Sequence, residues 1–354
     1  MRMRRHAQGT CVCAQIALDP AGYERQCRSI ARPRCGIAGR TVAPGGCMQF
    51  GVQVNCYRTN WDAISASIMA LEAGRWHSLW FADHFLPPPG RRDEEHLTAF
   101  EGWTLIAVAA GMTKRLVLGH LVLGNTYRNP ALVAKMAATL DQASRGRLVL
   151  ALGAAWFKRE HEAYGWAFPS MQERQDRFEE ACALIRALFR ASGPVDFRGR
   201  YYQLDQAPLS PGCYQQPHVP IMVGGTGEKR TLRTLARHGD VFNLDGWAGQ
   251  GMSMAVYRHK AEVLARHCEA VGRDPAEVRH TLLMPVRVTD DAASAERFVR
   301  GLGPGTVAGS RQYVIDRIGE FADAGVSEVM FGAVPTGDIE AYQRLDAEIL
   351  SAFG

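Results

Sequence analysis

Residues 48–354 are predicted to adopt an α/β fold, a closed (β/α)8 TIM barrel with an insertion after the fourth β/α unit. Short apolar segments rich in β-branched residues alternate with segments of helical spacing, and this alternation occurs eight times. Strands that are buried on both faces of a parallel sheet have this texture. Eight units favour a closed barrel over an open, doubly wound sheet. The open alternative would also need a G-x-G-x-x-G after the first strand, and "VQVNCYRTNWD" has none.

The first four β/α units occupy residues 48–190. Their strands are expected at "MQFGVQVN", "SLWFADHF", "RLVLGHLVLG" and "RLVLALGAAW". Their helices are expected at "NWDAISASIMALEAGRW", "FEGWTLIAVAAGMT", "NPALVAKMAATLDQASRG" and "ERQDRFEEACALIRALFR". The third of these helices has Pro130 near its first turn and Gly146 at its end, which are common start and stop signals.

An insertion at about 193–219 interrupts the alternation. Within it "DFRGRYYQL" predicts a hairpin, and the rest is a Pro-rich loop that is long enough to suggest a functional role. The alternation then resumes with strands at "PIMVGG", "DVFNLDG", "RHTLLMPVRVT" and "SEVMFGAV". The accompanying helices are expected at 228–239, 252–272, 310–326 and 339–353. No linker divides residues 48–354, so they are interpreted as one domain.

Residues 1–47 differ in composition from the rest of the chain. Eight arginines against one aspartate and one glutamate give this leader a net charge of +6, whereas the whole chain carries +5. Five of the nine cysteines lie here, yet their spacing fits no common zinc pattern. The segment also lacks the apolar core of a secretory signal. We expect a non-structural leader, either disordered or the result of a mis-assigned start, with Met48 as the biological start.

The composition of residues 48–354 excludes several classes of protein. Since this part is close to neutral, it offers no basic stripe for nucleic acid. No apolar run reaches the 18 or so residues that a membrane span needs. The remaining cysteines are scattered singly, as in a reduced cytosolic protein. We therefore expect a cytoplasmic protein with a small-molecule substrate, no membrane or nucleic-acid partner, and no metal site.

Asp83 and His84 end the second predicted strand, and the carboxyl ends of the strands form the active-site face of such a barrel. A histidine beside a carboxylate can transfer a proton near neutral pH. The simpler interpretation is that Asp83 caps the following turn while His84 packs. We predict that both residues are catalytic.

The stretch "VGGTGEKR" runs from a strand through Gly224, Gly225, Thr226 and Gly227 directly into a helix. Bare backbone N–H groups, a hydroxyl and a helix N-terminus together form a cradle for an anion. A tight turn that needs glycine for its positive φ is the alternative interpretation. We predict that these four residues bind the phosphate of a cofactor.

Three segments together resemble a known family: "FADHF", "TYRNPALVAKMAATLDQASRGRLVLALGAAWFKREHEAYG" and "VGGTGEKRTLRTLARHGD". They are similar to the luciferase-like monooxygenase superfamily, and most similar to its branch of oxidoreductases that depend on the deazaflavin coenzyme F-420 (8-hydroxy-5-deazaflavin). The resemblance covers nearly all of residues 48–354. Related members use reduced FMN in the same barrel, so FMN is the alternative cofactor.

The resemblance implies a set of cofactor-binding residues. Family members hold a non-prolyl cis peptide under the ring, in a bulge after the third strand. The matching residues here are Leu121 and Val122, with Gly124 beyond them. Gly153 and Ala154 match positions small enough for a flat ring to lie against the fourth strand.

The resemblance also bears on the residues around the ring. Asp83 and His84 match positions near its hydroxyl and its reactive carbon. Trp156 stands where some deazaflavin dehydrogenases have an acidic glutamate, which makes Trp156 a pocket wall and puts a sugar-phosphate type of proton relay in doubt. From its place just before a helix, Arg128 could neutralise a phosphate or pair with a carboxylate to brace the barrel mouth, and we expect bracing. Glu160 is read as part of a turn, either structural or functional.

The function implied is hydride transfer between coenzyme F-420 and an unidentified small organic substrate, with His84 as the proton partner. The insertion would then be a lid that excludes water. One alternative is a monooxygenase that uses reduced FMN, and another is a non-catalytic barrel that binds a flavin or deazaflavin. Family members often pair, so a homodimer is a further expectation.

Overall fold

The computed structural model describes residues 47–89, 97–247 and 251–353. Nearly all of the expected leader, residues 1–46, lies outside the described residues.

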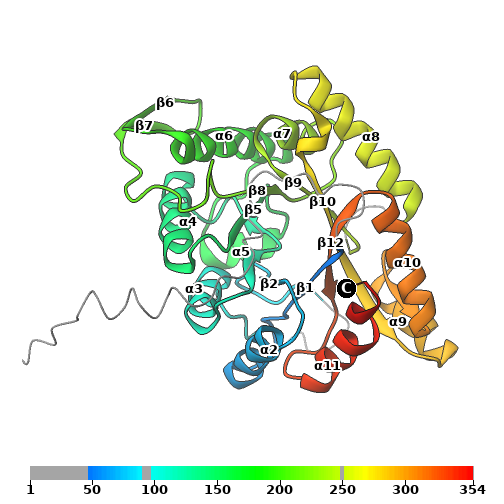
Figure 1. Cartoon of the computed structure of the whole chain (residues 1–354). Helices are drawn as coiled ribbons and strands as arrows, with labels where there is room; N and C mark the ends of the chain where they lie inside the picture. The colour runs from blue at the N-terminus through cyan, green and yellow to red at the C-terminus, as the bar shows by residue number, and fades with distance from the viewer. Residues whose placement is uncertain (1–46, 90–96, 248–250, 354) are drawn as a thin grey trace, which may run out of the picture. The chain divides into compact units, whose positions relative to one another are not determined.

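The core of the fold is a closed ring of eight parallel strands, which confirms the predicted (β/α)8 barrel (Figure 1). These strands are β1 (Gln49–Gln53), β2 (Ser78–Phe81), β3 (Val117–His120), β5 (Leu148–Gly153), β8 (Ile221–Val223), β9 (Val241–Asp245), β10 (Arg279–Val288) and β12 (Val326–Gly332). They follow one another around the ring in this order, and β12 pairs back with β1. The ring has no free edge, because each strand has a parallel neighbour on both sides.

Helices surround the strands, as Figure 1 shows. They are α2 (Trp61–Ala73), α3 (Gly102–Met112), α4 (Pro130–Ser144), α5 (Lys158–Tyr164), α6 (Met171–Arg190), α7 (Thr231–His238), α8 (Met254–Ala270), α9 (Ala292–Leu302), α10 (Arg311–Asp323) and α11 (Ile339–Glu348), with 3-10 turns at Pro275–Glu277 and Leu350–Ala352. Every residue of β5 and of β12 is buried. Burial on both faces explains why β5 appears in the sequence as an unbroken apolar run. In β12 the buried residues include Ser327 and Glu328, and Glu328 pairs with Arg279 at 3.3 Å.

The ends of α4 follow the signals in the sequence. Asn129 caps the helix by accepting a hydrogen bond from the Ala131 amide at 2.9 Å, and Pro130 occupies the first turn. Arg145 and Gly146 then adopt left-handed φ angles of 57° and 82°, which stop the helix.

Three elements were not predicted: α5, α9 and the short strand β11 (Val307–Gly309), which pairs with the end of β10. In α5 the buried residues are Glu160 and His161, which are polar, so hydrophobic periodicity could not reveal this helix. In α9 the apolar residues Ala295, Phe298, Val299 and Leu302 do have helical spacing, so this helix could have been predicted from the sequence.

The expected insertion contains an antiparallel hairpin of β6 (Val195–Arg198) and β7 (Gln203–Ala207). Glu180 of α6 holds its turn, because its carboxylate accepts hydrogen bonds from the amides of Arg200, Tyr201 and Tyr202 at 3.0, 2.8 and 2.6 Å. These bonds attach the hairpin to α6, and Figure 1 shows the two side by side.

Candidate active site

The residues predicted to form the site follow the carboxyl ends of four neighbouring strands. Asp83 and His84 follow β2, and Leu121 and Val122 join β3 to the short strand β4 (Leu123–Gly124). Gly153 ends β5 and Ala154 follows it, and the loop 224–227 follows β8. Because these strands are parallel and adjacent, their ends meet at one rim of the barrel. We call this rim the mouth.

The bulge after β3 has the backbone that the family resemblance implied. The Leu121–Val122 peptide bond is cis and not prolyl. Gln53 of β1 donates a hydrogen bond from Nε2 to the Leu121 carbonyl at 3.2 Å. A Cβ atom on Gly153 or on Gly224 would lie 2.9 or 2.6 Å from Cγ2 of Val122. Both positions therefore need glycine to let Val122 pack between β5 and β8.

We expect Gly224→Ala to lower the free energy of unfolding by about 1–3 kcal/mol, because the added methyl group would overlap Val122. Urea titration measures the change. Gly319→Ala in α10 is the matched control, since nothing lies within 4 Å of that position and alanine favours a helix by about 1 kcal/mol. Equal stability of Gly224→Ala and the wild type would show that Val122 does not need this space.

The glycine loop after β8 differs from its prediction in one respect. Gly225 has a φ of 100°, which favours glycine. However, α7 does not start directly after Gly227: a turn at 228–230 comes between, and Thr231 is the first helical residue. The Leu232 amide donates to the Gly227 carbonyl at 3.0 Å, which closes this turn. The loop thus presents bare backbone one turn away from the helix end.

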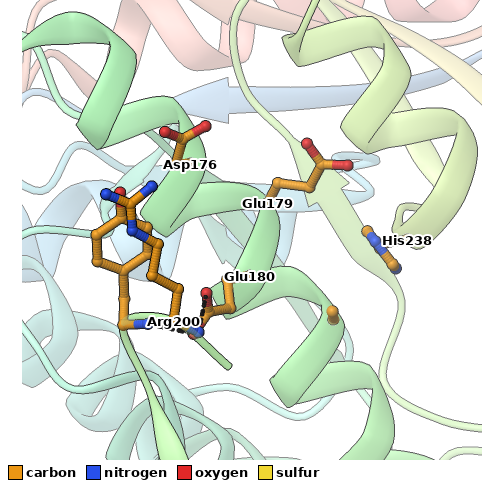
Figure 2. Close-up of a pocket in the computed structure, with 7 residues that line it drawn as sticks. Asp176, Glu179, Glu180, Arg200 and His238 are labelled. Atoms are coloured by element: carbon orange, nitrogen blue, oxygen red, sulfur yellow. Dashed lines mark hydrogen bonds between the residues drawn. The ribbon is translucent and has the colours of Figure 1, made fainter. Parts of the chain in front are cut away.

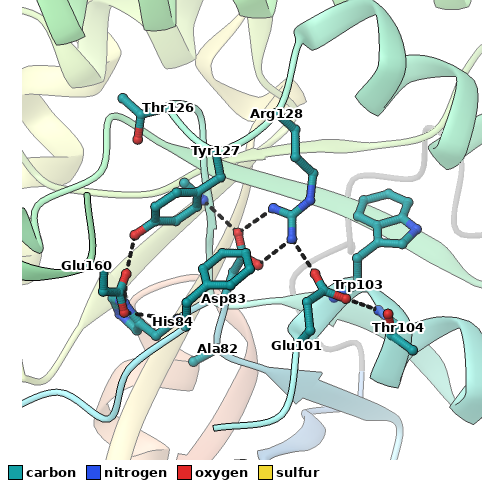
Figure 3. A network of polar contacts seen from close by, with 12 residues as sticks. Ala82, Asp83, His84, Glu101, Trp103, Thr104, Thr126, Tyr127, Arg128 and Glu160 are labelled. Atoms are coloured by element: carbon teal, nitrogen blue, oxygen red, sulfur yellow. Dashed lines mark hydrogen bonds and ion pairs between the residues drawn. The ribbon is translucent and has the colours of Figure 1, made fainter. Parts of the chain in front are cut away.

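Asp83 is buried, with 2% of its surface exposed, and is fully engaged by its neighbours (Figure 3). Arg128 donates from Nη1 and Nη2 to its two carboxylate oxygens at 2.8 and 2.9 Å, and the Gly124 amide donates at 3.1 Å. Burial alone would lower the pKa of Arg128, but the bonds and charge of Asp83 raise it above its ordinary value. Arg128 therefore braces the mouth, as predicted.

Arg128 continues this network to Glu101, whose carboxylate it also contacts. Glu101 caps α3 by accepting hydrogen bonds from the amides of Trp103 and Thr104 at 3.1 and 2.6 Å. Burial would raise the pKa of Glu101, but the bonds from Thr104 and the charge of Arg128 lower it. The ion-pair chain from Asp83 to Glu101 thus connects the end of β2 to the start of α3.

The side chain of His84 contacts the carboxylate of Glu160 and not that of its sequence neighbour Asp83. Its Nδ1 lies 3.0 Å from Oε1 of Glu160, whereas Asp83 faces Arg128 (Figure 3). Successive residues of an extended segment alternate in direction, which separates the two side chains. The His84 ring also packs edge-on against Trp156 at a centroid distance of 5.4 Å. Trp156 is 57% exposed, so it forms a wall beside His84.

The phenol of Tyr57 also lies beside His84. The Tyr57 ring is centred 6.0 Å from the imidazole. Its hydroxyl is buried and has no hydrogen-bond partner among the described residues. Burial raises the pKa of Tyr57 well above its ordinary value, so the hydroxyl keeps its proton. A buried donor without a partner can be satisfied by a ligand.

Comparison with known proteins identifies the family. Residues 45–305, more than half of the chain, match the model of the luciferase-like monooxygenase family. This chain belongs to that family.

Two curated relatives show which branch of the family is similar. The chain is 32% identical over 220 residues to the F420-dependent glucose-6-phosphate dehydrogenase of Amycolatopsis mediterranei, a match that covers 60% of this chain and 62% of the relative. It is 31% identical over 252 residues to the F420-dependent hydroxymycolic acid dehydrogenase of Mycobacterium tuberculosis, covering 69% and 64%. The chain thus spans a little under two thirds of the length of these relatives.

A solved structure supports the fold. The F420-dependent secondary alcohol dehydrogenase in complex with an F420-acetone adduct superposes with a TM-score of 0.68 at 24% identity, over 85% of this chain and 98% of that one. At this identity the similarity supports the barrel alone.

The sequence left the role of Glu160 open between structural and functional, and it gave no sign that this residue is buried. Glu160 lies in the charged stretch "KREHEAY", which is typical of a solvated helix face, yet its side chain is fully buried. No local pattern distinguishes it from Glu162, which is 61% exposed at its side chain. Only the position of His84, 76 residues away, shows what Glu160 contacts.

A hollow of about 440 Å³ lies elsewhere, between α6, the hairpin and the end of α7 (Figure 2). Its three carboxylates are all engaged: Asp176 pairs with Arg230, Glu179 pairs with two arginines of α7, and Glu180 holds the hairpin turn. None of the predicted site residues lines it. This hollow is therefore distinct from the mouth.

No group of three or more histidine, cysteine, aspartate or glutamate side chains in 47–89, 97–247 and 251–353 could hold a metal ion. Over the same residues, no helix has the length and apolar character to cross a bilayer.

Proposed function

We propose that this chain is an oxidoreductase that transfers a hydride between coenzyme F-420 and a small organic substrate, interconverting a hydroxyl and a carbonyl group. The observation that supports it most is the Val122 bulge packed against Gly153 and Gly224 at the same mouth as His84. The similar proteins described above are named as F420-dependent dehydrogenases, and each name implies a hydroxyl-bearing substrate.

The residues at the mouth fit a flat cofactor. Leu121, Val122, Gly124, Gly153 and Ala154 would hold the ring, since small residues and bare backbone let a planar group approach closely. The loop of Gly224, Gly225, Thr226 and Gly227 would hold the phosphate through the backbone N–H groups of residues 225–227. The Gly224 amide donates to the Leu152 carbonyl at 2.7 Å, so Gly224 would contribute by its small size. When bound, the coenzyme supplies the carbon that accepts or returns the hydride.

The chain itself would handle the proton. As the substrate C–H bond is lost as a hydride, the ring nitrogen of His84 that does not face Glu160 would take the proton of the substrate hydroxyl. In the reverse direction the same nitrogen returns the proton to the new alkoxide oxygen. Trp156, exposed beside His84, would place an apolar wall next to the substrate. Asp83 would help to shape the mouth rather than transfer a proton, since Arg128 and the Gly124 amide already donate hydrogen bonds to its carboxylate.

The hairpin contributes one contact near the mouth. The side-chain amide of Asn125, just after β4, donates from Nδ2 to the hydroxyl of Tyr202, which lies between the two strands of the hairpin, at 3.4 Å. This contact supports a shielding role for the segment, as the sequence predicted for a lid.

A paired binding experiment tests this function. The full chain is titrated with F-420 and separately with FMN, and we expect the Kd for F-420 to be at least about tenfold lower. Turnover is then followed by the absorbance of F-420 with a panel of secondary alcohols, sugar phosphates and ketones. Tighter binding of FMN with consumption of oxygen would indicate a monooxygenase instead. Binding without turnover of any compound would indicate a non-catalytic barrel.

A further inference from the structure

Glu160 accepts hydrogen bonds from four donors although none of its surface is exposed. The amides of Phe85 and Leu86 donate to Oε1 at 3.0 and 3.2 Å, and the Tyr127 hydroxyl donates to Oε2. Nδ1 of His84 lies 3.0 Å from Oε1 and 3.2 Å from Oε2. Figure 3 shows Tyr127 and His84 converging on this carboxylate. A carboxylate offers about four acceptor sites, so this set uses all of them.

The three other donors determine whether His84 or Glu160 donates the hydrogen bond between them. A backbone amide can only donate, so Oε1 must act as an acceptor. The phenol of Tyr127 keeps its proton, because burial and its bond to Glu160 raise its pKa. The carboxylate is therefore the acceptor throughout, and the proton of the contact belongs to Nδ1 of His84. In the neutral ring, Nε2 is then the nitrogen with a free lone pair.

We propose that Glu160 is a positioning residue that holds His84 as the Nδ1–H tautomer and leaves Nε2 as the proton-accepting atom. This proposal rests on the proposed role of His84 in proton transfer. Glu160 is suited to it because it lies in α5, directly after β5, and reaches across to the loop that follows β2. The ring is thereby oriented by two barrel units at once, those of β2 and β5, which lie on either side of β3.

A purely structural role is the competing explanation, because Glu160 also holds the backbone of residues 85 and 86. The substitution Glu160→Gln separates the two. The glutamine carbonyl can keep both backbone bonds at the Oε1 position, whereas the new NH2 group replaces Oε2. The amides of Phe85 and Leu86 use the two lone pairs of that carbonyl oxygen, which leaves the NH2 group, at the Oε2 position 3.2 Å from Nδ1, as the partner of the ring. This group can only donate, so it favours a His84 ring whose Nδ1 accepts. We therefore expect the ring to switch to the Nε2–H tautomer.

The tautomer is measured by two-bond proton–nitrogen correlation spectra of protein labelled with 15N-histidine. The spectra are taken at about pH 8, above the ordinary imidazole pKa of about 6.5. The His84 signals are identified by their loss in His84→Gln. We expect Nδ1–H in the wild type and Nε2–H in Glu160→Gln. We also expect kcat to fall about 10²- to 10⁴-fold in Glu160→Gln, with the Kd for F-420 within twofold.

Glu162→Gln is the matched control, since Glu162 lies in the same helix and, among the described residues, forms an ion pair only with exposed Lys158. We expect it to behave as the wild type in both measurements. An Nε2–H ring in the wild type would overturn the proposal without any variant, even if Glu160→Gln failed to fold. A switched tautomer with unchanged kcat would overturn it as well. Absence of turnover in the wild type would count against the proposed function, whereas the spectra would still decide the role of Glu160.

Discussion

Replacement of His84 by glutamine is expected to lower kcat about 10²- to 10⁴-fold, with the Kd for F-420 within about twofold. The reason is that His84 would be the group that takes the hydroxyl proton while the hydride leaves. Its ring is 15% exposed and is held by Glu160 and Trp156, so it is oriented and still accessible. Absorbance of F-420 under single-turnover conditions measures the chemical step.

His238→Gln is the matched control for this variant. His238 ends α7 and lines the outer hollow, away from the mouth (Figure 2). Burial lowers its pKa to about 4, so the ring is neutral and glutamine preserves its charge near pH 7. We expect wild-type kcat from His238→Gln. If His84→Gln turned over as fast as this control, His84 would not be the proton partner.

Arg128→Met is expected to cost about 3–5 kcal/mol of the free energy of unfolding, because it leaves the buried carboxylate of Asp83 without its partner. The surface pair of Arg177 and Glu173 provides the contrast. Their side chains are 35% and 37% exposed, so Arg177→Met is expected to cost less than about 1 kcal/mol. Urea unfolding at neutral pH measures both values.

A double substitution tests the cause of that loss. Asp83→Leu combined with Arg128→Met removes both charges, so it should cost less than Arg128→Met alone. If both variants lost the same stability, the effect would come from lost packing of the Arg128 side chain rather than from an unpaired charge. A loss of about 1 kcal/mol or less in Arg128→Met would show that Asp83 finds water or another donor.

The strands and most helices could be predicted because their signals are local. A strand such as β5 is buried on both faces, so each of its residues is small or apolar and the segment stands out in the sequence. The start of α4 at Pro130 and its end before Gly146 depend on residues within one turn. Of the two helices that were missed, α5 buries only Glu160 and His161 and so has no apolar stripe. In α9 apolar residues at 295, 298, 299 and 302 have helical spacing, so its local signal was present and was overlooked.

The site was predictable in position but not in its contacts. Family resemblance indicated the cis peptide at Leu121–Val122, which the backbone confirms. The resemblance did not indicate that a Cβ at Gly153 or Gly224 would overlap Val122. Asp83 and His84 are adjacent in the sequence, which does not show that Asp83 contacts Arg128 while His84 contacts Glu160.

The order and type of the secondary-structure elements, and therefore the barrel, follow from the amino-acid sequence, because hydrophobic period and end signals act between residues a few positions apart. The tertiary structure alone decided that Arg128 closes on Asp83, 45 residues away, and that Glu160 closes on His84 across 76 residues. Such pairs form only when the folded barrel brings the ends of different strands together at one rim and removes these charges from water. No short segment of the sequence contains both residues of either pair.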